Sequence, residues 1–261
     1  MAEGVAMTGN GPAIDALQHE GVTYPPPPGM CTYAVIGSPA VYARADADPI
    51  GWWEEQAHRL QWDSPWDVAL DDSTPPFYRW FTGGTLNASA NCLDRHLHER
   101  GDRVAFHWEG EPGDRLSITY RELHGRVCRF ANALKDLGVE RGGRVAIYMG
   151  MILELPIAML ACARLGAAHT VVFGGFSSEA LRDRMEDFGA TVLVTQDHSF
   201  RAGKKVPLKA NSDAALAQAP GVRHCVVARR SGDPVDWTED RDLWFQDIED
   251  AADPDCPAEP M

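Results

Sequence analysis

Basic side chains gather late in the chain, at Arg201, Lys204, Lys205 and Lys209. Only four lysines occur among the 261 residues, and three of them lie in this stretch. Arginine and lysine bind phosphate oxygens through charge-assisted hydrogen bonds. The stretch therefore predicts a site for an anionic, phosphorylated ligand. The alternative is a solvated basic start to a helix.

A second candidate is the glycine pair that follows the apolar run Val171-Val172-Phe173. The run predicts a short buried strand, and Gly174-Gly175 ends it. Ser177 or Ser178 is expected to cap a helix that ends near Gly189. Ligands bind at the carboxyl ends of strands in open parallel sheets, so the turn could line a site. A tight strand-to-helix connection without a ligand is the alternative.

The elements that must position these residues alternate regularly along the chain. Two apolar runs, 104–108 and 116–120, predict a β-hairpin. Further strands are expected at 145–149, 169–173, 191–195 and 224–228, and helices at 48–57, 87–100, 119–137, 156–165, 178–188, about 205–218 and 243–250. Continuous apolar strands that alternate with helices predict an α/β fold, with a parallel β-sheet covered by helices on both faces.

Composition divides the chain into four expected parts. Residues 1–29 read as a mobile arm, and 30–86 as an aromatic-rich segment clamped on the body, since tryptophans typically anchor such segments. Residues 87–252 are expected to form the α/β subdomain. Residues 253–261, rich in proline and acidic residues, read as a linker into further sequence.

Charge and motif content argue against several functions. The net charge of −14 disfavours binding to nucleic acid or to anionic membranes. No apolar run approaches the roughly 20 residues that span a bilayer. The six cysteines are widely spaced without a C-x-x-C pair, which indicates reduced thiols and a cytoplasmic location. Because no phosphate-loop, dinucleotide or nucleophile-elbow motif is present, we assign no catalytic and no metal-binding residue.

Several motifs, in the same order across residues 22–261, resemble the early region of the AMP-forming acetyl-CoA synthetases, members of the adenylate-forming enzymes. They are Trp80-Phe81-Thr82-Gly83-Gly84, Asn91-Cys92-Leu93-Asp94-Arg95-His96, Trp108-Glu109-Gly110-Glu111-Pro112-Gly113-Asp114, Cys128-Arg129-Phe130-Ala131-Asn132-Ala133-Leu134, Met159-Leu160-Ala161-Cys162-Ala163-Arg164-Leu165 and Val171-Val172-Phe173-Gly174-Gly175-Phe176-Ser177. The sequence departs from that family at Gly150 and Leu153, where the family usually has proline.

The resemblance implies a two-step reaction. Acetate and MgATP give acetyl-AMP and pyrophosphate, and coenzyme A (CoA) then gives acetyl-CoA and AMP. It implies that Arg201, Ala202, Gly203 and Lys204 bind the phosphorylated adenosine end of CoA. It also implies that Phe173, Gly174 and Gly175 line the tunnel for the pantetheine arm.

The same resemblance implies that the chain is an incomplete part of the large N-terminal domain. The family's ATP loop, acetate pocket and small C-terminal domain would follow residue 261, so we expect this chain alone to be inactive. The alternative is a standalone CoA-binding or regulatory module without catalysis. An unfinished sheet would leave an open edge through which copies could associate.

Overall fold

The computed structural model describes residues 23–27 and 29–261. Most of the expected mobile arm, residues 1–29, lies outside the described residues. The chain forms two units, one that ends at Glu55 and one that comprises Gln56–Met261. The first carries α2 (Met30–Tyr33) and α3 (Ala40–Ala47), while α4 (Pro49–Ala57) crosses the division and confirms the helix expected at 48–57.

The second unit begins with a small aromatic cluster. Strands β1 (Val68–Asp71) and β2 (Arg79–Thr82) pair in antiparallel fashion. The rings of Trp62, Trp66 and Phe81 meet edge to face, with centroids 4.9–5.7 Å apart. This geometry is favourable for aromatic pairs, so the cluster holds the strand pair together.

The single helix expected at 87–100 is wrong. The chain forms α5 (Ala88–Cys92), the 3-10 turn η1 (Asp94–His96) and α6 (Leu97–Arg100) instead. The break falls at Leu93, whose φ of −121° and ψ of −66° are not helical. The Leu93 side chain is only 1% exposed, so the broken backbone places an apolar group in the core.

The predicted hairpin and the helix after it are confirmed. Strands β3 (Val104–Glu109) and β4 (Arg115–Thr119) are antiparallel, and α7 (Tyr120–Asp136) follows at once. Thr119 and Glu122 form the reciprocal hydrogen bonds of a capping box. These bonds satisfy two backbone donors that a helix start would otherwise leave free.

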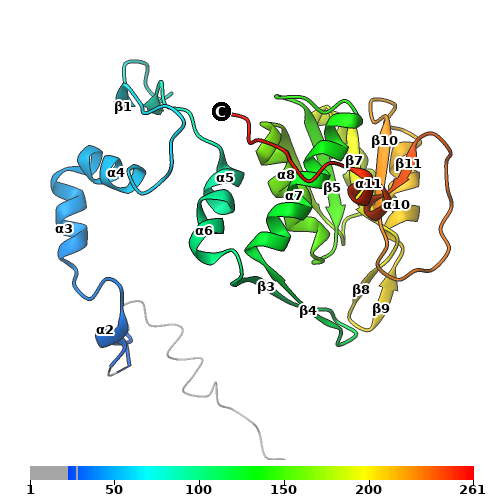
Figure 1. The fold of residues 1–261 in the computed structure, drawn as a ribbon, viewed down its shortest axis with the longest axis horizontal. Helices are drawn as coiled ribbons and strands as arrows, with labels where there is room; N and C mark the ends of the chain where they lie inside the picture. The colour runs from blue at the N-terminus through cyan, green and yellow to red at the C-terminus, as the bar shows by residue number, and fades with distance from the viewer. Residues whose placement is uncertain (1–22, 28) are drawn as a thin grey trace, which may run out of the picture. The chain divides into compact units, whose positions relative to one another are not determined.

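A five-stranded parallel sheet forms the centre of the unit (Figure 1), in the order β11-β10-β7-β5-β6. Its strands are β5 (Arg144–Met149), β6 (Ala168–Phe173), β7 (Val192–Gln196), β10 (His224–Ala228) and β11 (Asp242–Trp244). Strand β6 lies on one side of β5 and all later strands lie on the other. The connections therefore reverse direction at β5, which is where open α/β sheets bind ligands.

Helices cover both faces of the sheet, as the sequence predicts. On one face, α7, α8 (Glu154–Leu165) and α11 (Phe245–Ala251) pack on alternate residues of β5, β7 and β10. On the other, α9 (Ser178–Phe188) and α10 (Leu208–Leu216) pack on the intervening residues. Helices α8 and α9 follow connections that run in opposite directions, and right-handed crossovers then place them on opposite faces.

Three expectations at the edges of this sheet are corrected. Strand β6 is an edge strand rather than a buried one, with Val171 45% and Phe173 55% exposed. The helix expected at 243–250 begins only at Phe245, as α11, because residues 242–244 form the unpredicted strand β11. The tail 253–261, expected to be a linker, packs on the body. Cys256 is buried, and Leu86 and Met261 exchange backbone hydrogen bonds of 2.9 and 3.1 Å.

Among the described residues, no helix combines the length and apolar character that a membrane crossing requires. The same part of the chain contains no group of three or more His, Cys, Asp or Glu side chains arranged to hold a metal ion.

Candidate functional site

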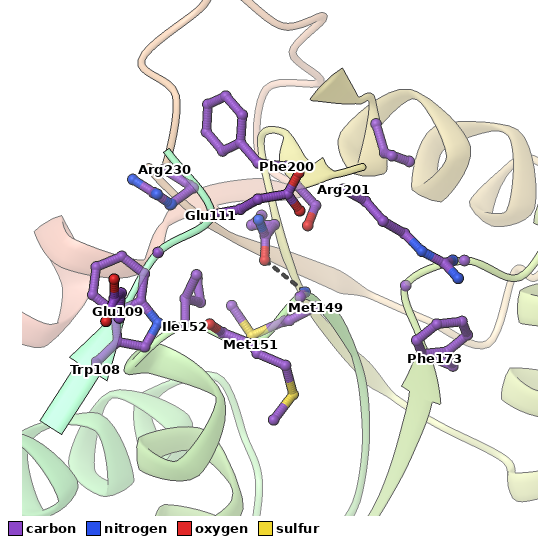
Figure 2. A pocket seen from close by; sticks show the side chains of 17 residues that line it. Trp108, Glu109, Glu111, Met149, Met151, Ile152, Phe173, Phe200, Arg201 and Arg230 are labelled. Atoms are coloured by element: carbon purple, nitrogen blue, oxygen red, sulfur yellow. Dashed lines mark hydrogen bonds between the residues drawn. The ribbon is translucent and has the colours of Figure 1, made fainter. Parts of the chain in front are cut away.

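A cavity of about 620 Å³ opens at the carboxyl ends of β5, β6 and β7 (Figure 2). Its lining includes Met149 at the end of β5, Gly150 directly after it, and Gln196 at the end of β7. The cavity lies where strand connections reverse direction. The position matches the expected ligand-binding edge of a doubly wound sheet.

The structure brings four of the predicted site residues to this cavity: Phe173, Gly174, Gly175 and Arg201. The Arg201 guanidinium stacks over the Phe173 ring, 4.9 Å from its centroid. A Cβ atom at Gly175 would collide with both side chains. Glycine is therefore what allows this stack to close against the loop after β6.

The other three predicted residues form a turn beside the cavity and do not line it. Ala202 and Gly203 connect β8 (Ser199–Arg201) to β9 (Lys204–Val206). Both have positive φ, +49° and +71°, as a two-residue hairpin turn requires. The basic stretch is thus a hairpin, and the alternative of a helix start is wrong.

The basic residues also separate in space. Lys209 is 1% exposed and pairs with Asp213 at 2.7 Å and Asp242 at 2.9 Å. It neutralises the buried carboxylate of Asp242 and the partly exposed one of Asp213, so it is not part of the patch. Lys205 pairs with Asp233, whose pKa this contact lowers. Of the four basic residues in this stretch, Arg201 and Lys204 remain beside the cavity without an ion-pair partner among the described residues.

Sequence reasoning missed the opposite wall of the cavity. The Arg230 guanidinium lies 5.0 Å from the ring centroids of both Trp108 and Phe200. Asp114 fixes it through an ion pair of 2.8 Å, and Trp108 donates its indole N–H to the Met151 carbonyl at 2.7 Å. The sequence signal here was the family-like motif that contains both Trp108 and Asp114, whereas no motif included Phe200 or Arg230.

Buried polar side chains hold the loops around the cavity. The Asp197 carboxylate is 1% exposed and accepts hydrogen bonds from the backbone amides of His198, Arg230, Ser231 and Gly232 and from the Ser231 hydroxyl. One side chain therefore joins the loop after β7 to the loop after β10. This arrangement positions Arg230 at the cavity.

Tyr148 supports the glycine loop from below. Its ring is fully buried on β5, and burial raises the pKa of its hydroxyl. The hydroxyl donates to the Phe176 carbonyl at 2.8 Å. A neutral tyrosine donor at this position holds the backbone that follows Gly174-Gly175.

Two family models together match most of the chain. Residues 93–260 match the model described as AMP-binding enzyme, and residues 39–92 match the one described as acetyl-coenzyme A synthetase N-terminus. These matches cover the sheet, the cavity and the aromatic cluster.

Curated relatives agree. The chain is 51% identical to acetyl-coenzyme A synthetase of Rubrobacter xylanophilus over 241 residues, which cover 92% of this chain and 37% of the relative. It is 52% identical over 223 residues to acetyl-coenzyme A synthetase 2 of Pseudomonas putida, covering 85% and 35%. For acetyl-coenzyme A synthetase of Cupriavidus necator the identity is 48% over 258 residues, covering 95% and 39%.

The chain thus spans somewhat more than a third of the length of these relatives. Within that span the family matches run from residue 39 to residue 260. The chain therefore belongs to the AMP-binding enzymes, and it corresponds to the N-terminal region of the acetyl-coenzyme A synthetases.

Proposed function

We propose that this chain supplies part of the CoA site of a cytoplasmic acetate–CoA ligase. The complete enzyme would convert acetate, ATP and CoA to acetyl-CoA, AMP and pyrophosphate through acetyl-AMP. Acetate and MgATP are its other substrates, and we assign no residue of this chain to them. The relatives' names and the family models support this assignment.

Within the chain, Arg201, Ala202, Gly203 and Lys204 are assigned to the phosphorylated end of CoA. Phe173, Gly174 and Gly175 are assigned to the passage for its pantetheine arm. The observation that carries the proposal is the Arg201–Phe173 stack at the 620 Å³ cavity. It places the Arg201 cation and the glycine pair Gly174-Gly175 at the same ligand-sized cavity. A narrow ligand that carries phosphate groups requires both a cation and a loop without bulky side chains.

Isothermal titration of the purified chain with CoA tests the binding part. We expect weak binding, because residues 1–261 span little more than a third of the length of the relatives, and a site that is only partly organised binds poorly. Arg201→Glu should abolish it, whereas Arg79→Glu, on the exposed surface of β2, should not. Equal affinities for CoA in the two variants would contradict the assignment.

A chimera tests the ligase part. Residues 1–261 would be joined to the remaining portion of the Rubrobacter xylanophilus relative. Acetate-dependent exchange between ATP and pyrophosphate reports the first step without CoA, and acetyl-CoA formation reports the second. Arg201→Glu should raise the KM for CoA and leave the exchange intact; equal loss in both steps would contradict the role.

The alternative function, a CoA-binding module without catalysis, uses the same cavity. It would show CoA binding by the chain and no exchange in the chimera. Self-association through the edge strand β6 is a separate prediction, which sedimentation of the purified chain checks.

A further inference from the structure

A carboxylate occupies the turn to which we assign phosphate binding. The Gly203 amide donates a hydrogen bond of 2.6 Å to Oε1 of Glu111. Glu111 belongs to the β3–β4 hairpin, 92 residues away in sequence. Figure 2 shows its side chain extending across the mouth of the cavity toward the hairpin that carries Arg201.

The turn itself is built to present a backbone amide. Ala202 and Gly203 both adopt positive φ, so the amide of Gly203 points away from the hairpin ladder instead of into it. Turns of this kind expose backbone N–H groups that bind anions. Ala202 holds this conformation at a steric cost that glycine would not incur, and such local strain is typical of functional sites.

The charges around the turn favour an anion that is not Glu111. Lys205 and Arg230, which flank it, are paired with Asp233 and Asp114. In the described part of the chain, Arg201 and Lys204 form no ion pair. The Glu111 carboxylate thus accepts one hydrogen bond from the turn. Arg201 and Lys204, beside it, can still bind an anion.

We propose that Glu111 is a built-in competitor for the ligand's phosphate. Its carboxylate occupies the Gly203 amide in the free protein, and a phosphate group that also contacts Arg201 and Lys204 replaces it. A phosphate has more acceptor oxygens and more charge than one carboxylate, so it satisfies the amide and both cations together. This inference rests on the proposed CoA function. It adds a residue that weakens the binding of ligands with too little negative charge to displace the Glu111 carboxylate.

The test compares two variants of the same hairpin. Glu111→Gln and Glu109→Gln each remove one negative charge, but Glu109 contacts Arg115 at 2.8 Å and does not touch the turn. Wild type and both variants are titrated with CoA and with inorganic pyrophosphate. We expect Glu111→Gln to bind both ligands about threefold to tenfold tighter. The glutamine oxygen can still accept from the Gly203 amide, but without the charge that makes the carboxylate the stronger acceptor. Glu109→Gln should change affinity less than twofold.

Equal gains in the two variants would show a general charge effect and overturn the inference. Weaker binding by Glu111→Gln would overturn it too, because Glu111 would then be a positioning residue for the turn. The Gly203 amide resonance gives a second readout. It should shift in Glu111→Gln without ligand and move back when pyrophosphate is added.

The two proposals fail in different ways. Suppose that Glu111→Gln specifically tightens pyrophosphate binding but that CoA binds to no variant. The competition by Glu111 then stands, and the proposed CoA function fails. Suppose instead that CoA binds and that Arg201→Glu abolishes this binding, but that Glu111→Gln has no specific effect. The proposed CoA function then stands, and the competition by Glu111 fails. If neither ligand binds to any variant, both are overturned.

Discussion

The Arg164 guanidinium binds both carboxylate oxygens of Asp94, each at 2.8 Å, across 70 residues of sequence. Arg164 is only 3% exposed, and its Nε donates to the carbonyl of Cys256 in the tail. Asp94 lies on the 3-10 turn η1 at the break in the expected helix. The pair therefore joins the early helices, α8 and the tail at one buried point.

Removing Arg164 should destabilise the chain strongly. Arg164→Ala leaves the half-buried Asp94 without its guanidinium partner, and the loss of one member of a buried pair costs about 3–5 kcal/mol. Denaturant unfolding measures this. Arg115→Ala, which removes an exposed pair with Glu109, is the control and should cost less than about 1 kcal/mol. Similar costs for both would show that the Asp94 pair is not a structural anchor.

Stability should also depend on pH through His124. Its Nε2 lies 3.4 Å from Oδ1 of Asp94, and the hydrogen bonds to Asp94 and Cys128 raise its pKa to about 9, although Arg164 is also near. Because the pKa of His124 is higher in the folded than in the unfolded state, the folded state binds this proton more tightly. Protonation of His124 therefore stabilises the fold. The contribution is therefore complete below about pH 6.5 and is lost as pH rises through 9.

Asp94 works in the opposite direction. The same contacts with Arg164 and His124 hold its pKa well below the ordinary value of 3.8. Its contribution is present above about pH 4 and is lost as pH falls. His124→Gln should flatten the alkaline decline in unfolding free energy and leave most of the acid decline, because Arg164 still contacts Asp94. A nuclear magnetic resonance titration that placed the His124 pKa near 6.5 would refute the first effect.

Asp197 should be needed for both the fold and the cavity. Asp197→Ala leaves several buried amides without an acceptor, and we expect a loss of about 3 kcal/mol in unfolding free energy. Loss of the loop that carries Arg230 should also weaken CoA binding in conditions where the variant remains folded. Asp233→Ala, which removes an exposed pair with Lys205, is the control and should alter stability little.

Gly150 is expected to tolerate neither proline nor alanine, for different reasons. Its amide donates to Oε1 of the fully buried Gln196 at 2.7 Å, and a Cβ atom would collide with the Ser199 hydroxyl. Gly150→Pro loses the donor, which should cost about 1–3 kcal/mol. Gly150→Ala keeps the donor, so adding Ser199→Ala should restore much of its stability.

Ser199→Ala should not rescue Gly150→Pro, because the amide is still absent. Thermal or denaturant unfolding of the four variants decides this. Rescue of the proline variant would show that the collision, and not the lost hydrogen bond, is the main cost.

The sequence alone was sufficient for many of the local elements. The boundaries of α9 and β10 were predicted residue for residue, and the Thr119–Glu122 capping box formed as expected. Strand periodicity and cap chemistry depend on residues a few positions apart, so they are readable before any fold is known. The family motifs are local runs of the same kind.

Tertiary structure decided the rest. It removed Lys209 from the basic patch, placed β6 at the sheet edge, and bound the tail to residues 86 and 164. It also brought Trp108, Phe200 and Arg230 together and set Glu111 on the Gly203 amide. Each of these contacts joins groups that lie far apart in sequence. Which groups meet is determined by the order of the strands and the packing of the loops, and no local pattern encodes either.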